Sequence, residues 1–173
     1  MVSILREETD YLEVSKKYAN DKYVIIEPWV DRVDHIRLTI IGKENTPYKD
    51  GKFVFEIKCG SNYPYAPPYV YCQTLIWHPN IDSSMPPGKA NICLDLINPD
   101  LVGKVDAKTG ASGWTPAKTL VSIVEALKGM IHIVPPFWNP GDPLNNKAGE
   151  QALNNMKKFR KEAKKWTEKY AKR

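Results

Sequence analysis

Length, composition and charge exclude several classes of protein. The chain has 173 residues, of which 42% are hydrophobic and 26% charged, as is usual for a soluble globular protein, and we expect one domain over residues 1–173. No apolar run approaches the roughly 20 residues that a membrane-spanning helix needs, and the N-terminal stretch lacks the apolar middle of a secretory signal. We therefore expect a monomer in the cytoplasm, the nucleus or both, without membrane attachment.

The net charge of +5 does not by itself indicate a nucleic-acid partner, because Lys and Arg concentrate only in the last 17 residues. There they alternate with an apolar stripe, which is the pattern of the solvated face of a helix. Three cysteines, Cys59, Cys72 and Cys93, cannot all pair, and none lies in a CxxC or a His/Cys cluster of zinc-like spacing. We expect neither nucleic-acid binding, nor a disulfide framework, nor a metal site.

The first half of the chain predicts one helix followed by a sheet. Residues 3–19 place Ile4, Leu5 and Tyr11 among acids and lysines, which predicts an amphipathic helix ending near Asn20. Short runs rich in β-branched and aromatic residues follow, separated by turn residues, and predict up to four strands in an antiparallel meander. These runs cover residues 23–30, 35–42, 53–59 and 69–77.

The second half predicts a long loop and then helices. Residues 79–113 show little periodicity apart from an apolar island around Cys93, and loops of this length inside a domain are usually functional. Thr115 is expected to cap the next helix, with Pro116 at its first position, and residues 145–169 carry one apolar stripe on one or two further helices. The order of elements predicts an α+β domain.

Cys93 is the best candidate for chemistry among the three thiols. Cys59 and Cys72 sit at expected strand ends and fit inert core residues. Cys93 lies between two apolar neighbours while long polar segments flank the island on both sides, which favours a thiol held at the surface on a short strip. His78 or His132 could serve as its base in a cysteine hydrolase, but His78 precedes a proline and follows an aromatic residue, which favours a loop anchor.

Two further polar residues remain open to more than one interpretation. Asn80 could donate its amide to an oxyanion or could hold the backbone of an active-site loop, and the sequence does not separate these roles. Asp142 could cap the third helix, or it could orient and help deprotonate an incoming amine.

Seven short motifs, taken together and in order, resemble the catalytic core of the ubiquitin-conjugating enzymes. The similarity runs from about residue 35 to the end, and the first 34 residues match only as a helix and a strand. The motifs are TPYKDGKF (46–53), NYPYAPP (62–68), HPNI (78–81), ICLD (92–95), GWTP (113–116), DPL (142–144) and KKWTEKYA (164–171).

The resemblance implies a specific chemistry. Cys93 would accept the C-terminal carboxyl of ubiquitin or a ubiquitin-like protein from an activating enzyme as a thioester, and would pass it to a lysine of a substrate protein or to a ligase cysteine. Asn80 would support the oxyanion or the loop, and Asp142 would flank the lysine entry. No metal or cofactor is implied, because ATP is used by the activating enzyme. Structural positions at the active site would be His78, Pro79, Leu94 and Trp114.

The resemblance also implies partners and shows departures. Ligases of RING or HECT type and the activating enzyme would dock on the first helix and on loops matching Tyr65 and Thr115, Pro116 and Ala117. Residues 82–91 and 98–113 contain insertions beside the active site, a third short excess lies around 132–140, and Ile36 stands where the family usually has tryptophan. The alternative is a catalytically silent variant that acts as a binding module. Such variants typically lack the cysteine, which is present here.

Overall fold

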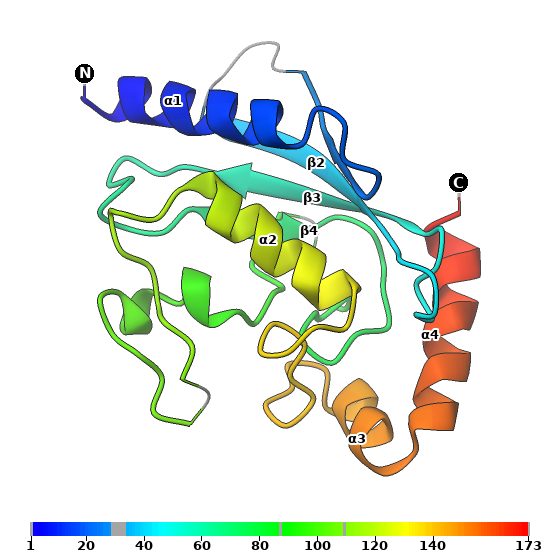
Figure 1. Ribbon diagram of the computed structural model, residues 1–173. Coiled ribbons are helices and arrows are strands. Elements are labelled where there is room, and N and C mark those ends of the chain that lie inside the picture. The colour runs from blue at the N-terminus through cyan, green and yellow to red at the C-terminus, as the bar shows by residue number, and fades with distance from the viewer. Residues whose placement is uncertain (1, 29–33, 87, 109, 173) are drawn as a thin grey trace.

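The computed structural model describes residues 2–28, 34–86, 88–108 and 110–172 (Figure 1). The side chains of Ile4 and Leu5, on which part of the first helix prediction rests, and residues 29 and 30 of the first expected strand lie outside the described part. The elements are α1 Val2–Lys17, β1 Val24–Ile26, β2 His35–Ile41, β3 Lys52–Lys58, β4 Tyr69–Cys72, the short 3-10 turns η1 Asp95–Ile97 and η2 Pro99–Leu101, α2 Leu120–Ile131, α3 Asn146–Asn154 and α4 Met156–Tyr170. The predicted α+β order is confirmed.

The four strands form the expected antiparallel meander in the order β1-β2-β3-β4. Buried and exposed side chains alternate along β2 and β3, so that Leu38 pairs with Phe55 and Ile40 with Phe53 on the core face. Strand β4 is shorter than predicted. After Cys72 one further backbone bond runs from the Gln73 N–H to the Val54 carbonyl at 2.8 Å, and the Val54 N–H donates to the Thr74 hydroxyl at 2.9 Å instead of to a backbone carbonyl.

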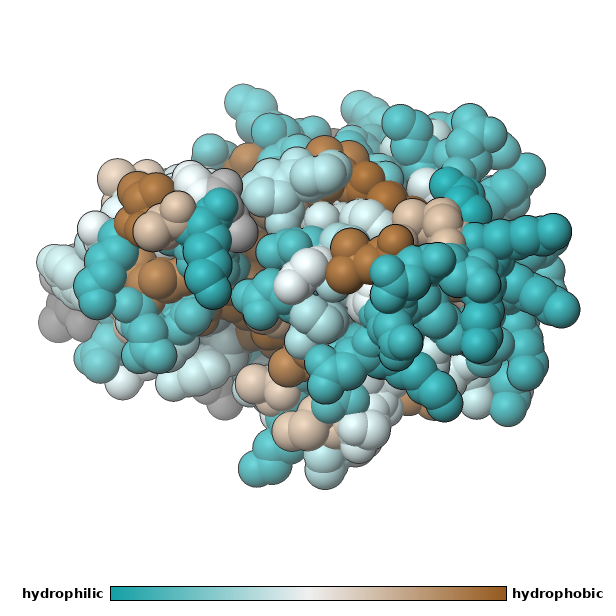
Figure 2. Space-filling view, turned by 90° about the horizontal axis from the view of Figure 1, so that it is seen from below, coloured by the Kyte–Doolittle hydropathy of each residue, from teal (hydrophilic) through white to brown (hydrophobic). Residues whose placement is uncertain are grey.

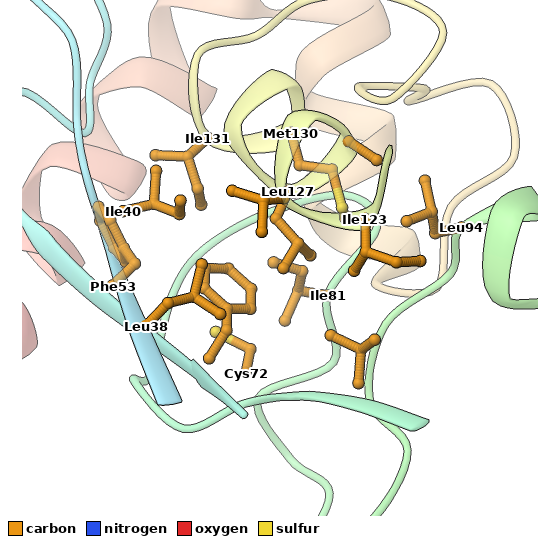
Figure 3. Close-up of a cluster of buried hydrophobic side chains, with 14 of the residues drawn as sticks. Leu38, Ile40, Phe53, Cys72, Ile81, Leu94, Ile123, Leu127, Met130 and Ile131 are labelled. Carbon is orange, nitrogen blue, oxygen red and sulfur yellow. The ribbon is translucent and has the colours of Figure 1, made fainter. Parts of the chain in front are cut away.

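Helix α2 covers one face of the sheet and supplies the other half of the core (Figure 1). Its side chains Ile123, Leu127 and Met130 lie in one buried cluster with Leu38 and Phe53 of the sheet, as Figure 3 shows. Helix α1 packs against α2. The core therefore lies between α2 and the sheet, and the segments that connect these elements form the site.

Helix α2 begins later than predicted. Thr119, in an extended conformation, is its N-cap, whereas the expected cap Thr115 precedes a turn in which Lys118 N–H donates to the Thr115 carbonyl at 3.0 Å. The Arg6 side chain donates to the carbonyls of Pro116 and Lys118 at 3.0 and 2.6 Å. The prediction of a helix start at Thr115 and Pro116 was wrong. The carbonyls of Pro116 and Lys118 accept hydrogen bonds from Arg6 of α1 and not from backbone N–H groups of a helix.

The C-terminal stripe divides into two helices. Asn145 caps α3 by accepting from Ala148 N–H, and Asn155 caps α4 by accepting from Lys158 N–H, both at 3.1 Å. Asp142 is therefore not the N-cap of the third helix. Hydrophilic side chains cover the α4 side of the molecule, on the right in Figure 2, while apolar residues appear toward the middle and left. Within the described residues, no helix combines the length and apolar character that crossing a bilayer requires.

Candidate active site

Cys93 lies on a short extended strip that is bonded to the HPNI segment. Its N–H donates to the Asn80 carbonyl at 2.9 Å, and Ile92 forms a bridge with Ile81. The next residue, Leu94, joins the buried cluster to which Ile123 of α2 also belongs (Figure 3). The backbone of the strip is thus fixed while the thiol of Cys93 stays half-buried.

The other two thiols differ from Cys93. Cys59, directly after β3, and Cys72, at the end of β4, are both buried, and burial raises the pKa of each to about 12. Neither has the exposure that a nucleophile needs, which fits their interpretation as inert core residues.

The electrostatic surroundings of Cys93 are negative. Partial burial, followed by the charges of Asp142 and then Asp95, raises the pKa of the Cys93 thiol above its ordinary value. A cysteine hydrolase needs the opposite, a thiol whose pKa is lowered by a nearby cation. Carboxylates beside the sulfur would instead attract the ammonium group of an incoming lysine.

His78 is built into the fold and is not a base for Cys93. It is completely buried, and its Nδ1 accepts the Asn80 N–H at 2.9 Å, so Nε2 carries the proton and donates to the Met130 carbonyl at 3.0 Å. Burial lowers the pKa of His78 to about 4, which keeps the ring neutral. The second candidate base, His132, contacts the Ile41 carbonyl through Nε2 at 2.9 Å. The two hydrogen bonds of His78 fit its interpretation as a loop anchor.

Asn80 uses its whole side chain to hold the loop of residues 139–142. Its Nδ2 donates to the carbonyls of Asn139 and Asp142 at 2.7 and 3.2 Å, and its Oδ1 accepts the Asn139 N–H at 2.8 Å. An amide has only two N–H hydrogens. Both are engaged here, so the structure favours the loop-holding role over the oxyanion role in this state.

The backbone of the HPNI segment continues this attachment. The Pro79 carbonyl accepts from Leu144 N–H at 2.8 Å and from Asn145 N–H at 2.9 Å. Together with Asn80, it fixes both ends of the segment that carries the exposed Asp142. The carboxylate, free of helix capping, lines a groove with Cys93.

The thiol lies where two grooves meet. A groove of about 400 Å³ is lined by Cys93, Asn80 and Asp142 together with α2. A second, of about 510 Å³, is lined mainly by apolar residues of β4 and the Cys93 strip, among them Tyr69 and Ile92. A polypeptide on each side of the sulfur could therefore reach it. No group of three or more His, Cys, Asp or Glu side chains among the described residues could hold a metal ion.

Within the insertion at 98–113, the described residues 103–106 and 111–113 pair with each other as the two arms of a hairpin, where we expected a long loop without regular structure. Val105 and Ser112 form a bridge, Gly113 N–H donates to the Lys104 carbonyl at 2.9 Å, and a Cβ on Gly113 would lie 1.9 Å from the Leu101 carbonyl oxygen. A side chain missed by sequence reasoning holds it in place. Lys118 donates to Ser112 Oγ at 2.6 Å and to the Gly113 carbonyl at 2.8 Å, so the hairpin is attached to the start of α2 and borders the first groove.

Of the residues expected to bind ligases, three are exposed and Thr115 is half-buried, and they lie close to one another in the fold. Tyr65 is 74% exposed, and Pro116 and Ala117 are exposed as well. Trp114 is fully buried and its indole N–H donates to the Pro64 carbonyl at 2.7 Å, which joins the two loops. The sequence placed these loops correctly on the surface, but not the contact between them.

A charged cluster that the sequence did not reveal joins the same loops to α1. Arg6 pairs with Asp10 at 2.8 Å, and the Tyr63 hydroxyl donates to the same carboxylate. Arg6 also binds the carbonyls of Pro116 and Lys118, so the Arg6–Asp10 pair connects α1 with both loops.

A comparison with known families assigns the chain. The family model for ubiquitin-conjugating enzymes matches residues 5–167. The chain belongs to the ubiquitin-conjugating enzyme family. Its fold is also similar to that of a putative ubiquitin conjugating enzyme from Plasmodium yoelii, with a TM-score of 0.74 and 26% identity over 98% of this chain and 95% of that one. The resemblance inferred from the motifs is therefore confirmed.

Curated relatives carry different modifiers in their names. The chain is 36% identical over 126 residues to the Nedd8-conjugating enzyme UbcE2M of Drosophila melanogaster (73% of this chain, 58% of that protein). It is 33% identical over 141 residues to ubiquitin-conjugating enzyme E2 T of Homo sapiens (82% and 62%) and 31% over 150 residues to ubiquitin-conjugating enzyme E2 13 of Saccharomyces cerevisiae (87% and 84%). The chain thus spans less than two thirds of the length of the first two relatives.

Proposed function

We propose that this protein is an active conjugating enzyme that carries ubiquitin or a ubiquitin-like protein as a thioester on Cys93. The observation that carries the proposal is the placement of a half-buried thiol, the only one of the three that is not buried, at the meeting of two grooves. Family membership supports the same assignment.

The reaction needs two acyl exchanges. In the first, the carbonyl carbon at the modifier's C-terminus bonds to the Cys93 sulfur and leaves the sulfur of the activating enzyme, which takes up the displaced proton. In the second, a lysine nitrogen bonds to that carbon, the C–S bond breaks, and a proton of the amine reaches the departing sulfur. The thioester is already activated, so the protein mainly positions the amine and removes its proton. ATP is consumed by the activating enzyme, and no cofactor is required here.

Asp142 and Asp95 are proposed to serve the second exchange. Their charges, which disfavour a thiolate on Cys93, attract the lysine ammonium to the same place. Asn80 contributes by holding the 139–142 loop through three hydrogen bonds, which keeps Asp142 at the rim of the groove. We assign Asn80 to loop positioning.

The proposed docking surface for the activating enzyme and for RING- or HECT-type ligases comprises α1, Tyr65 and residues 115–117. An exposed aromatic tip next to exposed proline suits such contacts, and the Arg6 cluster holds the three parts together. We propose ubiquitin as the modifier, with Nedd8 as the alternative because relatives of both kinds match the chain.

The test is thioester formation. The protein is mixed with ATP and either ubiquitin and its activating enzyme or Nedd8 and its own, and products are separated on a non-reducing gel. We expect an adduct that thiols remove, and Cys93→Ser should give an adduct that resists thiols because an oxyester replaces the thioester. Absence of an adduct with both modifiers would favour the silent binding module, and cleavage of ubiquitin esters without ATP would favour a hydrolase.

A further inference from the structure

The side chain of Asn91 forms an attachment that the family assignment does not explain. It lies two residues before Cys93 and is 7% exposed. Its Oδ1 accepts the Cys72 N–H at 2.9 Å and its Nδ2 donates to the Cys72 carbonyl at 2.8 Å. One amide therefore satisfies both backbone groups of the last residue of β4, as a neighbouring strand would.

Strand β4 is the edge of the sheet, so these backbone groups would otherwise lack a strand partner. The strip that carries the thiol takes this place with a side chain and not with its backbone. The Asn91 carbonyl itself accepts the Asp82 N–H at 2.9 Å. Asn91 thus closes the segment 82–91 at its end and fastens it to the rigid sheet.

The bonds between Asn91 and Cys72 matter because an insertion within residues 82–91 directly precedes the thiol strip. Residues 84–86 and 88–90 are exposed, and Gly88 has a φ of +77°. A longer exposed connection before the thiol adds conformational freedom to the strip. A buried amide with two backbone bonds, placed between this connection and Cys93, removes that freedom just before the sulfur.

Asn91 and Asn80 act on opposite sides of the thiol. Asn80 bonds to Cys93 through its backbone carbonyl and to the loop of Asp142 through its side chain. Asn91 bonds the same strip to Cys72 of β4. These bonds connect both the Cys93 strip and the loop of Asp142 to the sheet. A fixed distance between sulfur and carboxylate matters because acyl transfer is sensitive to small displacements of the reacting groups.

We propose that Asn91 is a positioning residue for acyl transfer, which ties the thiol strip to the edge strand β4 and so sets the place of the Cys93 sulfur relative to Asp142. The inference rests on the proposed function of Cys93. Asn91 touches no reacting atom, and it acts through the strip.

The first test compares two rates in Asn91→Ala. Loss of the attachment should expose the free thiol, so that alkylation of Cys93 by iodoacetamide, followed by mass spectrometry, rises about threefold or more. Discharge of the preformed thioester at saturating free lysine should fall about tenfold or more, because the acyl group is no longer held. Asn155→Ala is the matched control, since it removes a backbone-bonding amide at the α4 cap. It should leave both rates within about twofold of the parent protein.

The second test uses Asn91→Asp, which keeps the shape of the side chain. An aspartate side chain ordinarily ionises at about pH 4, so in the discharge assay it still accepts the Cys72 N–H but cannot donate to the Cys72 carbonyl, and its charge faces that oxygen. Discharge by this variant should therefore also fall about tenfold or more, while the folded fraction, measured by circular dichroism, stays close to that of the parent protein.

The outcomes separate the two proposals. Discharge by both variants at the parent's rate, or a rise in alkylation and a fall in discharge that only follow the loss of folded protein, would overturn the role of Asn91. If the parent protein forms no thioester with either modifier, the proposed function fails, and the alkylation rates alone then decide whether Asn91 positions the thiol.

Discussion

The buried imidazole of His78 should make the stability of the protein depend on pH between about 6.5 and 4. The pKa of this ring is lowered from 6.5 to about 4 by burial. As the pH falls, the unfolded chain takes up a proton before the folded protein does. Stability that is fully present above pH 6.5 is therefore lost progressively as the pH falls toward the folded pKa.

The magnitude follows from the two pKa values. A difference of this size corresponds to a total loss of about 3 kcal/mol in the free energy of unfolding, of which about 2 kcal/mol should be lost by pH 5. The same proton would occupy Nδ1 and break the bond from Asn80 N–H. Acid should thus loosen the HPNI segment directly.

Urea denaturation at pH 7, 6 and 5 measures the loss, and His78→Asn is the control because its Oδ1 can still accept from Asn80 N–H while the side chain does not titrate. The variant should be less stable at pH 7, since it loses the bond to the Met130 carbonyl. Its stability should nevertheless decrease less between pH 7 and 5 than that of the parent protein, by about 2 kcal/mol. A constant difference between the two proteins across this range would refute the buried neutral imidazole.

Four further substitutions test the site and its supports. Asn80→Ala should lower the free energy of unfolding by about 2–4 kcal/mol and slow discharge onto lysine, measured in single turnover, while thioester loading continues. Asp142→Ala should slow discharge onto free lysine mostly near neutral pH. If the variant and the parent protein discharge at equal rates across a pH series, Asp142 takes no part in deprotonating the amine. Arg6→Met should weaken ligase-stimulated discharge without changing discharge onto free lysine. Lys118→Met should speed amide hydrogen exchange in the hairpin, read at Gly113 by mass spectrometry.

The sheet and the main helix were predictable because burial there follows a fixed period. In β2 and β3 every second side chain faces the core, so the alternating apolar residues Ile36, Leu38 and Ile40 already identify the buried face. The apolar positions of α2, among them Ile123 and Leu127, follow the helical period in the same way. Local pattern and tertiary burial agree in these elements, and the predictions hold.

The start of α2 and the hairpin could not be predicted, because their partners are distant in the sequence. The Thr115–Pro116 pair carries a sound local signal for a helix start. The helix nevertheless starts later, because the Arg6 guanidinium, 110 residues away in the sequence, donates a hydrogen bond to the Pro116 carbonyl. The hairpin likewise depends on Lys118, a lysine that looks like any other in the sequence but has three acceptors within reach.

The site illustrates the same limit at the level of single atoms. The resemblance pointed to Asn80, but the role of an amide depends on which acceptors its two hydrogens meet. Both hydrogens of Asn80 bind carbonyls of the 139–142 loop. Stabilising an oxyanion would therefore require one of them to leave its carbonyl, and the longer bond, at 3.2 Å to Asp142, is the weaker of the two. Any oxyanion contact from Asn80 would thus loosen the loop that carries Asp142, so both roles draw on the same two hydrogens.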